Sequence, residues 1–138
     1  MKVMAIDYGD ARTGVAISDA LGWMTGQTTV IHSWKPEKTA EEVARLLRES
    51  GAERLVMGFP RNMDGSIGFQ AQKVQALAEQ LANVGLNIAF QDERLTTVTA
   101  ERALIEGGMH RQERKGTVDK VAAAVILQQY LDTLRNQT

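Results

Sequence analysis

The stretch AIDYGDARTGVAISD, residues 5–19, contains two short apolar runs, each of which ends in an aspartate. The first run begins at Val3, two residues before the quoted stretch, and ends at Asp7, which lies outside the predicted core. A turn over residues 9–14 follows, and residues 13–18 form the second run. Continuous apolar runs of this length are typical of strands covered on both faces, and glycine allows a tight turn between them. The stretch therefore predicts two strands joined by a short turn, with Asp7 at the end of the first.

The composition is that of one soluble folded domain. Of the 138 residues, 43% are hydrophobic and 24% are charged, and the formal net charge of −1 argues against a passive, strongly basic nucleic-acid coat protein. The absence of cysteine excludes disulfides, zinc–thiolate sites and cysteine nucleophiles. The first residues lack the pattern of a signal peptide, and the longest apolar run, residues 121–127, is far shorter than the ~20 residues that span a bilayer. We expect a single domain over residues 1–138, in the cytoplasm, with no membrane partner.

The remaining elements follow from changes in hydrophobic period. A third strand is expected within residues 24–31. Later strands are expected at 55–60 and 86–90, and helices around 40–50, 74–84, 96–105 and 117–134, the last with Thr117 as its N-cap. Residues 107–116 are expected to form a loop.

Three strands followed by alternating helices and strands predict an α/β fold. The order indicates a mixed five-stranded sheet (βββαβαβ, then C-terminal helices), with the later strands parallel to the first and helices on both faces. Ligands of such sheets bind beyond the carboxyl ends of the parallel strands. Asp7 ends the first strand, Asp92 and Glu93 end the fifth, and Asp119 falls in the first turn of the last helix, so these acids are expected to meet at one edge.

Carboxylates that converge in this way are typical of a magnesium site. Magnesium prefers oxygen ligands, and two such ions about 4 Å apart can activate the attacking and leaving oxygens of a phosphodiester. Each acid also has an ordinary structural explanation. Asp7 could bond turn amides, Asp119 could sit favourably at a helix N-terminus, and Asp92 or Glu93 could pair with a surface arginine.

Several basic residues could position a phosphate backbone, which would make nucleic acid the partner. The candidates are Arg12, Arg61, Arg94, Arg111, Arg114 and Lys115. The last three fall in the predicted loop before the last helix, where they could close over a strand. Trp23 and Trp34 could stack on bases, although packing is the commoner role of tryptophan. The two histidines lack the spacing of a metal site.

Four motifs in order resemble the YqgF/RuvX-like family of small RNase H-fold proteins. They are AIDYGDARTGVAISD, GFPRNMDGS, QDERLTT and TVDKVAAAVILQQYL, and together they cover residues 1–134. The resemblance implies an RNase H-like fold and a bacterial cytoplasmic nuclease, a hydrolase of phosphodiester bonds. Two roles have been suggested for the family: 5′-end maturation of pre-16S ribosomal RNA and resolution of Holliday junctions.

Carried over by position, the resemblance assigns Asp7, Glu93 and Asp119 as catalytic and metal ligands, with Asp92 in reserve. The cofactor would be Mg²⁺ or Mn²⁺, two ions in all. Structured RNA is the expected substrate, branched DNA the alternative, and a ribosome precursor a possible partner of a monomer or homodimer.

Two rival interpretations remain open. The first hairpin also resembles the phosphate-binding hairpin of actin-like ATPases and sugar kinases, but those proteins need a second copy, which 138 residues do not supply. A non-catalytic nucleic-acid or ribosome-assembly module would keep the fold without depending on metal. Such a module would tolerate Asp7→Asn, whereas a metallonuclease would not.

Overall fold

The computed structural model describes residues 1–59, 68–82, 88–92 and 111–136, except for the side chains of residues 92, 111–119, 135 and 136. Its centre is a five-stranded sheet with the order β3-β2-β1-β4-β5. The strands are β1 (Val3–Asp7), β2 (Arg12–Ser18), β3 (Thr25–His32), β4 (Arg54–Phe59) and β5 (Ile88–Asp92). All five predicted strands are therefore present, with bounds that differ by one or two residues.

The sheet is mixed, as predicted. β2 pairs antiparallel with both β1 and β3, whereas β4 lies parallel to both β1 and β5. The parallel strands β1, β4 and β5 thus end at the same edge of the sheet, which we call the carboxyl edge.

The pleat of β1 divides the core into two layers. Met4 and Ile6 pack in one buried cluster, and Val3 and Ala5 pack in another. Because successive side chains of a strand point to opposite faces, a central strand buried on both faces needs an unbroken apolar run. The run at residues 3–6 meets that requirement, since all four residues are fully buried.

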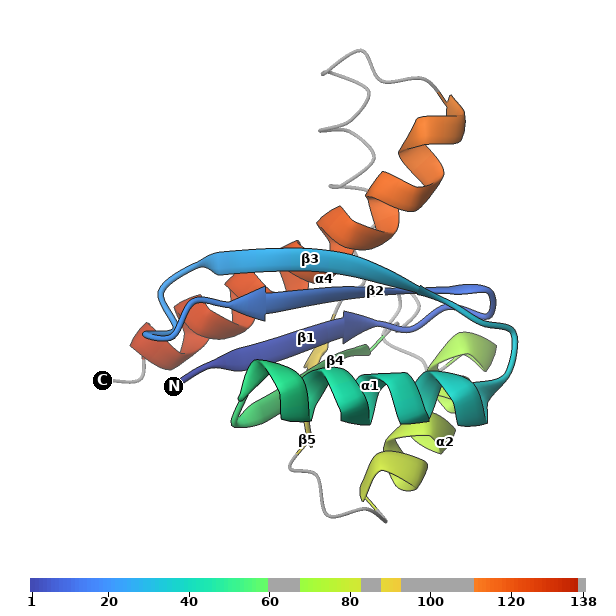
Figure 1. The fold of residues 1–138 in the computed structure, drawn as a ribbon, viewed down its shortest axis with the longest axis horizontal. Helices are drawn as coiled ribbons and strands as arrows, with labels where there is room; N and C mark the ends of the chain where they lie inside the picture. The colour runs from blue at the N-terminus through green and yellow to red at the C-terminus, as the bar shows by residue number, and fades with distance from the viewer. Residues whose placement is uncertain (60–67, 83–87, 93–110, 137–138) are drawn as a thin grey trace.

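Helices α1 (Pro36–Ser50) and α2 (Phe69–Ala82) cover one face of the sheet (Figure 1). Val43 and Leu47, one turn apart on α1, enter the same cluster as Met4. Proline opens α1 in its first turn, where no hydrogen bond is lost. Gly51 ends it with a left-handed φ of 74° and donates its N–H to the Arg48 carbonyl.

Helix α4 (Arg111–Asn136) covers the other face. Ala123, Ile126 and Tyr130 recur at helical spacing in the cluster that contains Val3 and Ala5. The prediction of a loop up to residue 116 and an N-cap at Thr117 was wrong, because the helix already begins at Arg111. The run RQERK consists of good helix formers, and the single Gly116 costs only about 1 kcal/mol inside a helix.

The short helix expected at residues 96–105 lies outside the described residues. Of the helices in the described ranges, none has the length and apolar character needed to cross a membrane.

A candidate metal and nucleic-acid site at the carboxyl edge

The two aspartates of the opening stretch lie at opposite ends of the sheet. Asp19 follows β2 and closes the turn to β3, since its Oδ1 accepts the backbone N–H of Trp23 at 2.8 Å. Asp7 is the last residue of β1 and lies at the carboxyl edge, opposite Gly14 on β2. The ordinary turn explanation therefore fits Asp19, and Asp7 lies at the edge beyond which ligands of such sheets bind.

Asp7 belongs to the face of the sheet that α4 covers. It is half-buried, and it has the same parity on β1 as Val3 and Ala5, which pack against α4. Its cross-strand neighbour is Gly14, and Gly58 follows Met57, the β4 partner of Ile6. Glycine on both flanking strands removes side-chain bulk beside the Asp7 carboxylate and allows another group to approach closely.

The direction of α4 brings its first half to the same edge. Arg54, the β4 partner of Val3, donates from Nη1 to the Tyr130 hydroxyl, so Tyr130 lies at the start of β1. Residue 119 precedes Tyr130 by eleven residues, or about 16 Å of helix. The four steps from Val3 to Asp7 span about 13 Å. Traced back from Tyr130, α4 therefore runs from the start of β1 toward the carboxyl edge, crossing the strands obliquely (Figure 1).

β5 lies beyond β4 at the side of the sheet, and its end extends the carboxyl edge. Asp92 ends β5 opposite Phe59, two strand spacings or about 10 Å from β1. Ala89 packs on the α4 face and Ile88 on the other, so odd positions of β5 face α4. Glu93 and Arg94 lie outside the described residues.

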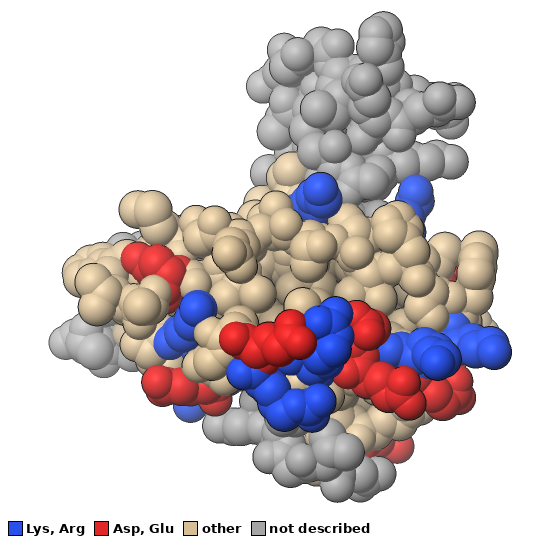
Figure 2. Space-filling model, in the orientation of Figure 1, with Lys and Arg blue, Asp and Glu red and all other residues tan. Residues whose placement is uncertain are grey.

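The predicted basic residues fall into two groups. Arg12 begins β2, directly after the turn from Asp7, and is half-buried. Arg111, Arg114 and Lys115 belong to the first turns of α4 rather than to a loop. Arg61 and the side chains of the α4 group lie outside the described residues. On the face shown in Figure 2, acidic and basic side chains are interleaved along α1, while the region over β3 is largely uncharged.

The structure places Asp7 and Arg12 at the carboxyl edge, whereas Glu93 and the side chain of Asp119 lie outside the described residues. Where side chains are described, no three histidine, aspartate or glutamate residues gather as a metal site. His32, at the end of β3, is exposed, and His110 lies outside the described residues.

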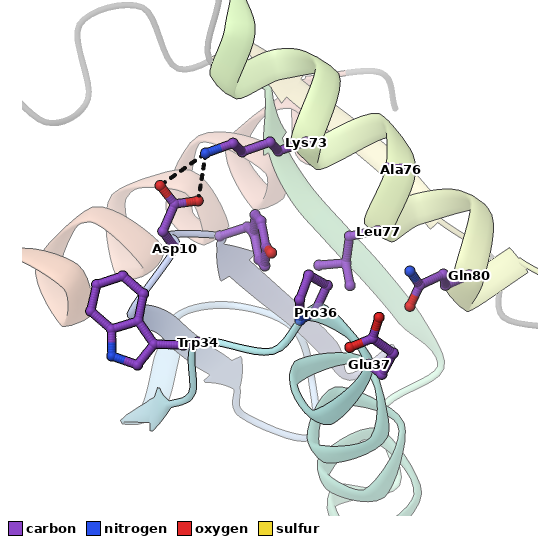
Figure 3. Close-up of a pocket in the computed structure, with 9 residues that line it drawn as sticks. Asp10, Trp34, Pro36, Glu37, Lys73, Ala76, Leu77 and Gln80 are labelled. Carbon is purple, nitrogen blue, oxygen red and sulfur yellow. Dashed lines mark hydrogen bonds and ion pairs between the residues drawn. The ribbon is translucent and has the colours of Figure 1, made fainter.

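Two side chains of α2 contact the turn that follows Asp7, and sequence reasoning missed them. Lys73 Nζ contacts both carboxylate oxygens of Asp10, at 2.9 and 3.0 Å (Figure 3). Gln70 Nε2 donates to the Tyr8 carbonyl at 3.0 Å. These pairs are 62 and 63 residues apart in the chain. A spacing pattern reports only local neighbours, so it could not have predicted them.

Beside these contacts lies a cavity of about 380 Å³ between α1, α2 and the turn. Tyr8, whose side chain belongs to the α1 and α2 face, forms part of its wall. Burial, together with the nearby carboxylate of Asp10, raises the pKa of the Tyr8 phenol, so its hydroxyl is protonated at neutral pH. The cavity and the Asp7 position thus lie on opposite faces of the same sheet edge.

The order of strands and the acid at the end of β1 define the class of protein: an α/β chain with the RNase H-type fold of known resolvases. Solved structures with a similar fold include Thermus thermophilus RuvC in complex with a Holliday junction (TM-score 0.58, 15% identity, 98% of this chain and 96% of that chain). The fowlpox virus resolvase with its Holliday junction DNA matches with a TM-score of 0.60 and 13% identity, over 97% of this chain and 99% of that one. At these identities, the similarity concerns the fold.

The family is defined by sequence. Residues 1–133 match the RuvX family, described as Holliday junction resolvase, and the chain belongs to that family. A relative from Moorella thermoacetica named "Putative pre-16S rRNA nuclease" is 47% identical over 135 residues, covering 97% of this chain and 96% of the relative. A relative of the same name from Desulforamulus reducens is 44% identical over 134 residues, covering 96% and 98%.

Proposed function

We propose that this protein is a metal-dependent nuclease that hydrolyses phosphodiester bonds in the 5′ region of precursor 16S ribosomal RNA. The observation that carries the proposal is the position of Asp7. This half-buried carboxylate ends a core strand at the carboxyl edge, on the face that α4 covers, in a chain of the RuvX family. A residue needed only for packing would not require an acid there.

The donors available at this edge suit Mg²⁺ or Mn²⁺. Asp7 offers hard carboxylate oxygens, and its cross-strand neighbour Gly14 has no side chain. Glu93 and Asp119 would complete the set for two ions. The family resemblance favours Glu93, and Asp92, the last residue of β5, is the reserve candidate. When bound, a divalent ion would stabilise negative charge on the phosphate and favour ionisation of an attacking water.

Basic side chains would hold the substrate strand. Arg12 stands at the start of β2, one turn from Asp7. We assign the same role to Arg94 and to Arg111, Arg114 and Lys115 on the first turns of α4. Each such contact with a phosphate adds sequence-independent affinity that falls with salt.

RNA is favoured over branched DNA because the relatives carry the name of an rRNA nuclease. The protein would then act in the cytoplasm on a ribosome precursor, as a monomer or homodimer. The junction remains the second candidate, since the family is described as a Holliday junction resolvase.

The test is cleavage of labelled precursor rRNA and of a four-way DNA junction by purified protein, with Mg²⁺, with Mn²⁺ and with chelator. We expect metal-dependent cutting of the RNA by the wild type and a loss of at least 10³-fold in Asp7→Asn, since ligand loss removes the ion's contribution of several kcal/mol. Asp19→Asn is the matched control. It ends the other apolar run at the far end of the sheet, its amide oxygen can still accept the Trp23 N–H, and it should cut normally.

Preferential cutting of the junction would move the assignment to the second candidate. Binding without cutting, unchanged in Asp7→Asn, would contradict both and would identify a non-catalytic module.

A further inference from the structure

The cavity between α1 and α2 has the composition of a site for a flat, partly polar ring. Its apolar surface comes from Trp34, Pro36, Ala76 and Leu77. Its polar groups come from Glu37 and Gln80 on the helices and from the Lys73–Asp10 pair at the turn. A second hollow of about 440 Å³ continues from it between the helices and shares Glu37 and Gln80.

Trp34 is the exceptional residue of this wall. Its side chain is 79% exposed, the largest value of any large hydrophobic residue among the described side chains. It lies in the short connection between β3 and α1 and contributes nothing to either buried cluster. Exposing an indole in this way forgoes burial energy, part of which a ligand that covered the ring would recover.

The polar groups of the wall are available to a ligand. Among the residues whose side chains are described, neither Glu37 nor Gln80 has a hydrogen-bond or ion-pair partner. Figure 3 shows both side chains reaching into the space between the helices. With Asp10, Glu37 and Lys73 the lining carries an excess of negative charge, so it disfavours a phosphate inside and favours a neutral ring that donates hydrogen bonds.

The cavity also lies where a substrate strand would pass. Tyr8 in its wall is the residue after Asp7, so the two positions are adjacent in the chain and on opposite faces of the carboxyl edge. The Lys73–Asp10 and Gln70–Tyr8 contacts fix the turn between them. A strand held at Asp7 could place a neighbouring nucleotide over this edge, provided that its base is not paired.

We propose that this cavity binds an unpaired nucleobase of the substrate strand, stacked on Trp34, with its hydrogen-bonding edge toward Glu37 and Gln80. The inference rests on the proposed function for the identity of the strand. Guanine is the base whose chemistry suits these groups, because its adjacent N1–H and N2–H can donate to a carboxylate such as that of Glu37 and its O6 can accept from an amide such as that of Gln80. The substrate is then single-stranded or distorted next to the cut rather than a continuous duplex.

Tryptophan fluorescence tests the stacking directly, because the chain has only two tryptophans. Trp23→Phe leaves Trp34 as the sole emitter, and Trp34→Phe leaves Trp23, also exposed (55%), as the matched control in the far turn. The probe is a short oligouridine RNA with one central guanosine, titrated in chelator so that no cleavage occurs. We expect quenching in Trp23→Phe and none in Trp34→Phe, with little quenching by a fully paired duplex of the same strand.

Affinity gives the second measurement. Trp34→Ala should bind the guanosine RNA about 5- to 150-fold more weakly, the range measured for removal of one stacking aromatic, and Trp34→Phe should recover part of the loss. Glu37→Gln should keep the quenching and lose the preference for guanosine over adenosine. Normal affinity in Trp34→Ala, equal quenching of both tryptophans, or equal quenching by the duplex would overturn the inference.

These results are separable from the nuclease assay, because binding in chelator does not depend on cleavage. If Trp34 is quenched in a protein that cuts neither substrate, the proposed nuclease is contradicted and the proposed base pocket is supported. If the wild type cuts and Trp34→Ala binds with unchanged affinity, the proposed nuclease is supported and the proposed base pocket is wrong.

Discussion

The last residue of β1 and the three residues after it contribute to two different sites. Asp7 lies on the face of α4, and Tyr8 lies on the face of α1 and α2. Gly9 and Asp10 then turn the chain toward β2, and Asp10 is held by Lys73. The alternation of a strand thus places a candidate metal ligand and a cavity wall on opposite faces with no intervening residue.

The turn leaves no room for a side chain at Gly9. A Cβ at this position would overlap the backbone carbonyl oxygen of Arg12. We expect Gly9→Ala to displace the turn and lower the cleavage rate roughly 10- to 100-fold, because small errors in position are costly in catalysis. The measurement is the single-turnover rate with Mg²⁺.

Gly26→Ala is the control for that variant. Its Cβ would come no closer than 3.4 Å to any atom, near the Ile17 carbonyl, so the rate should stay within twofold of wild type. Equal rates in both variants, with native circular dichroism, would show that the turn does not position Asp7.

Tyr8 makes the stability sensitive to alkaline pH. Burial, with a smaller contribution from Asp10, raises the pKa of its phenol above the ordinary 10.0. Below about pH 10 the phenol is protonated in both the folded and unfolded states, and the contribution to stability is complete. As the pH rises further, the unfolded state ionises first, so the free energy of unfolding falls.

The measurement is urea denaturation of wild type and Tyr8→Phe at several pH values from neutral to above 10. The phenylalanine variant has no group to ionise, so it should lose less stability than wild type over the alkaline range. Parallel pH profiles would contradict the assignment.

At the scale of elements, hydrophobic period was sufficient for the strands and for two helices. The unbroken run at residues 3–6 predicted a strand buried on both faces, and the spacing of Val43 and Leu47 predicted α1. The start of α4 was missed because Gly116 and Thr117 have the local pattern of a boundary, whereas the helix continues back to Arg111 through the helix-forming run RQERK.

The part of the site that depends on local hydrophobic pattern could also be predicted from the sequence. That Asp7 ends a parallel strand follows from the sequence pattern, so its place at the carboxyl edge could be predicted. The Lys73–Asp10 contact and the cavity beside it depend on how α2 docks on the sheet, which no local pattern records.

The contact of Arg54 with Tyr130 fixes α4 against the start of the sheet. We expect Tyr130→Phe to lower the free energy of unfolding by about 1–2 kcal/mol, because a partly buried guanidinium loses its hydrogen-bond acceptor. Thr133→Ala serves as the control, since its exposed hydroxyl bonds only to Gln129 within the helix; it should change stability by no more than about 0.5 kcal/mol. Equal effects in urea denaturation would show that this contact does not anchor the helix.

In the whole molecule, the sheet separates two candidate sites that lie on its opposite faces at the same edge. α4 and Asp7 lie on one side, and α1, α2 and the Trp34 cavity lie on the other (Figures 1 and 3). A nucleic-acid strand crossing this edge would meet both. The interleaved charges along α1 do not favour strong binding to that helix, so the account requires the strand to be held at the edge.

Anomalous diffraction from crystals soaked in Mn²⁺ will show whether Asp7 holds a divalent ion at the carboxyl edge. We expect manganese peaks beside the Asp7 carboxylate, on the face of α4, that vanish in Asp7→Asn and persist in Asp19→Asn. Well-diffracting crystals at saturating Mn²⁺ with no peak at Asp7, or with an unchanged peak in Asp7→Asn, would contradict the proposed metal site.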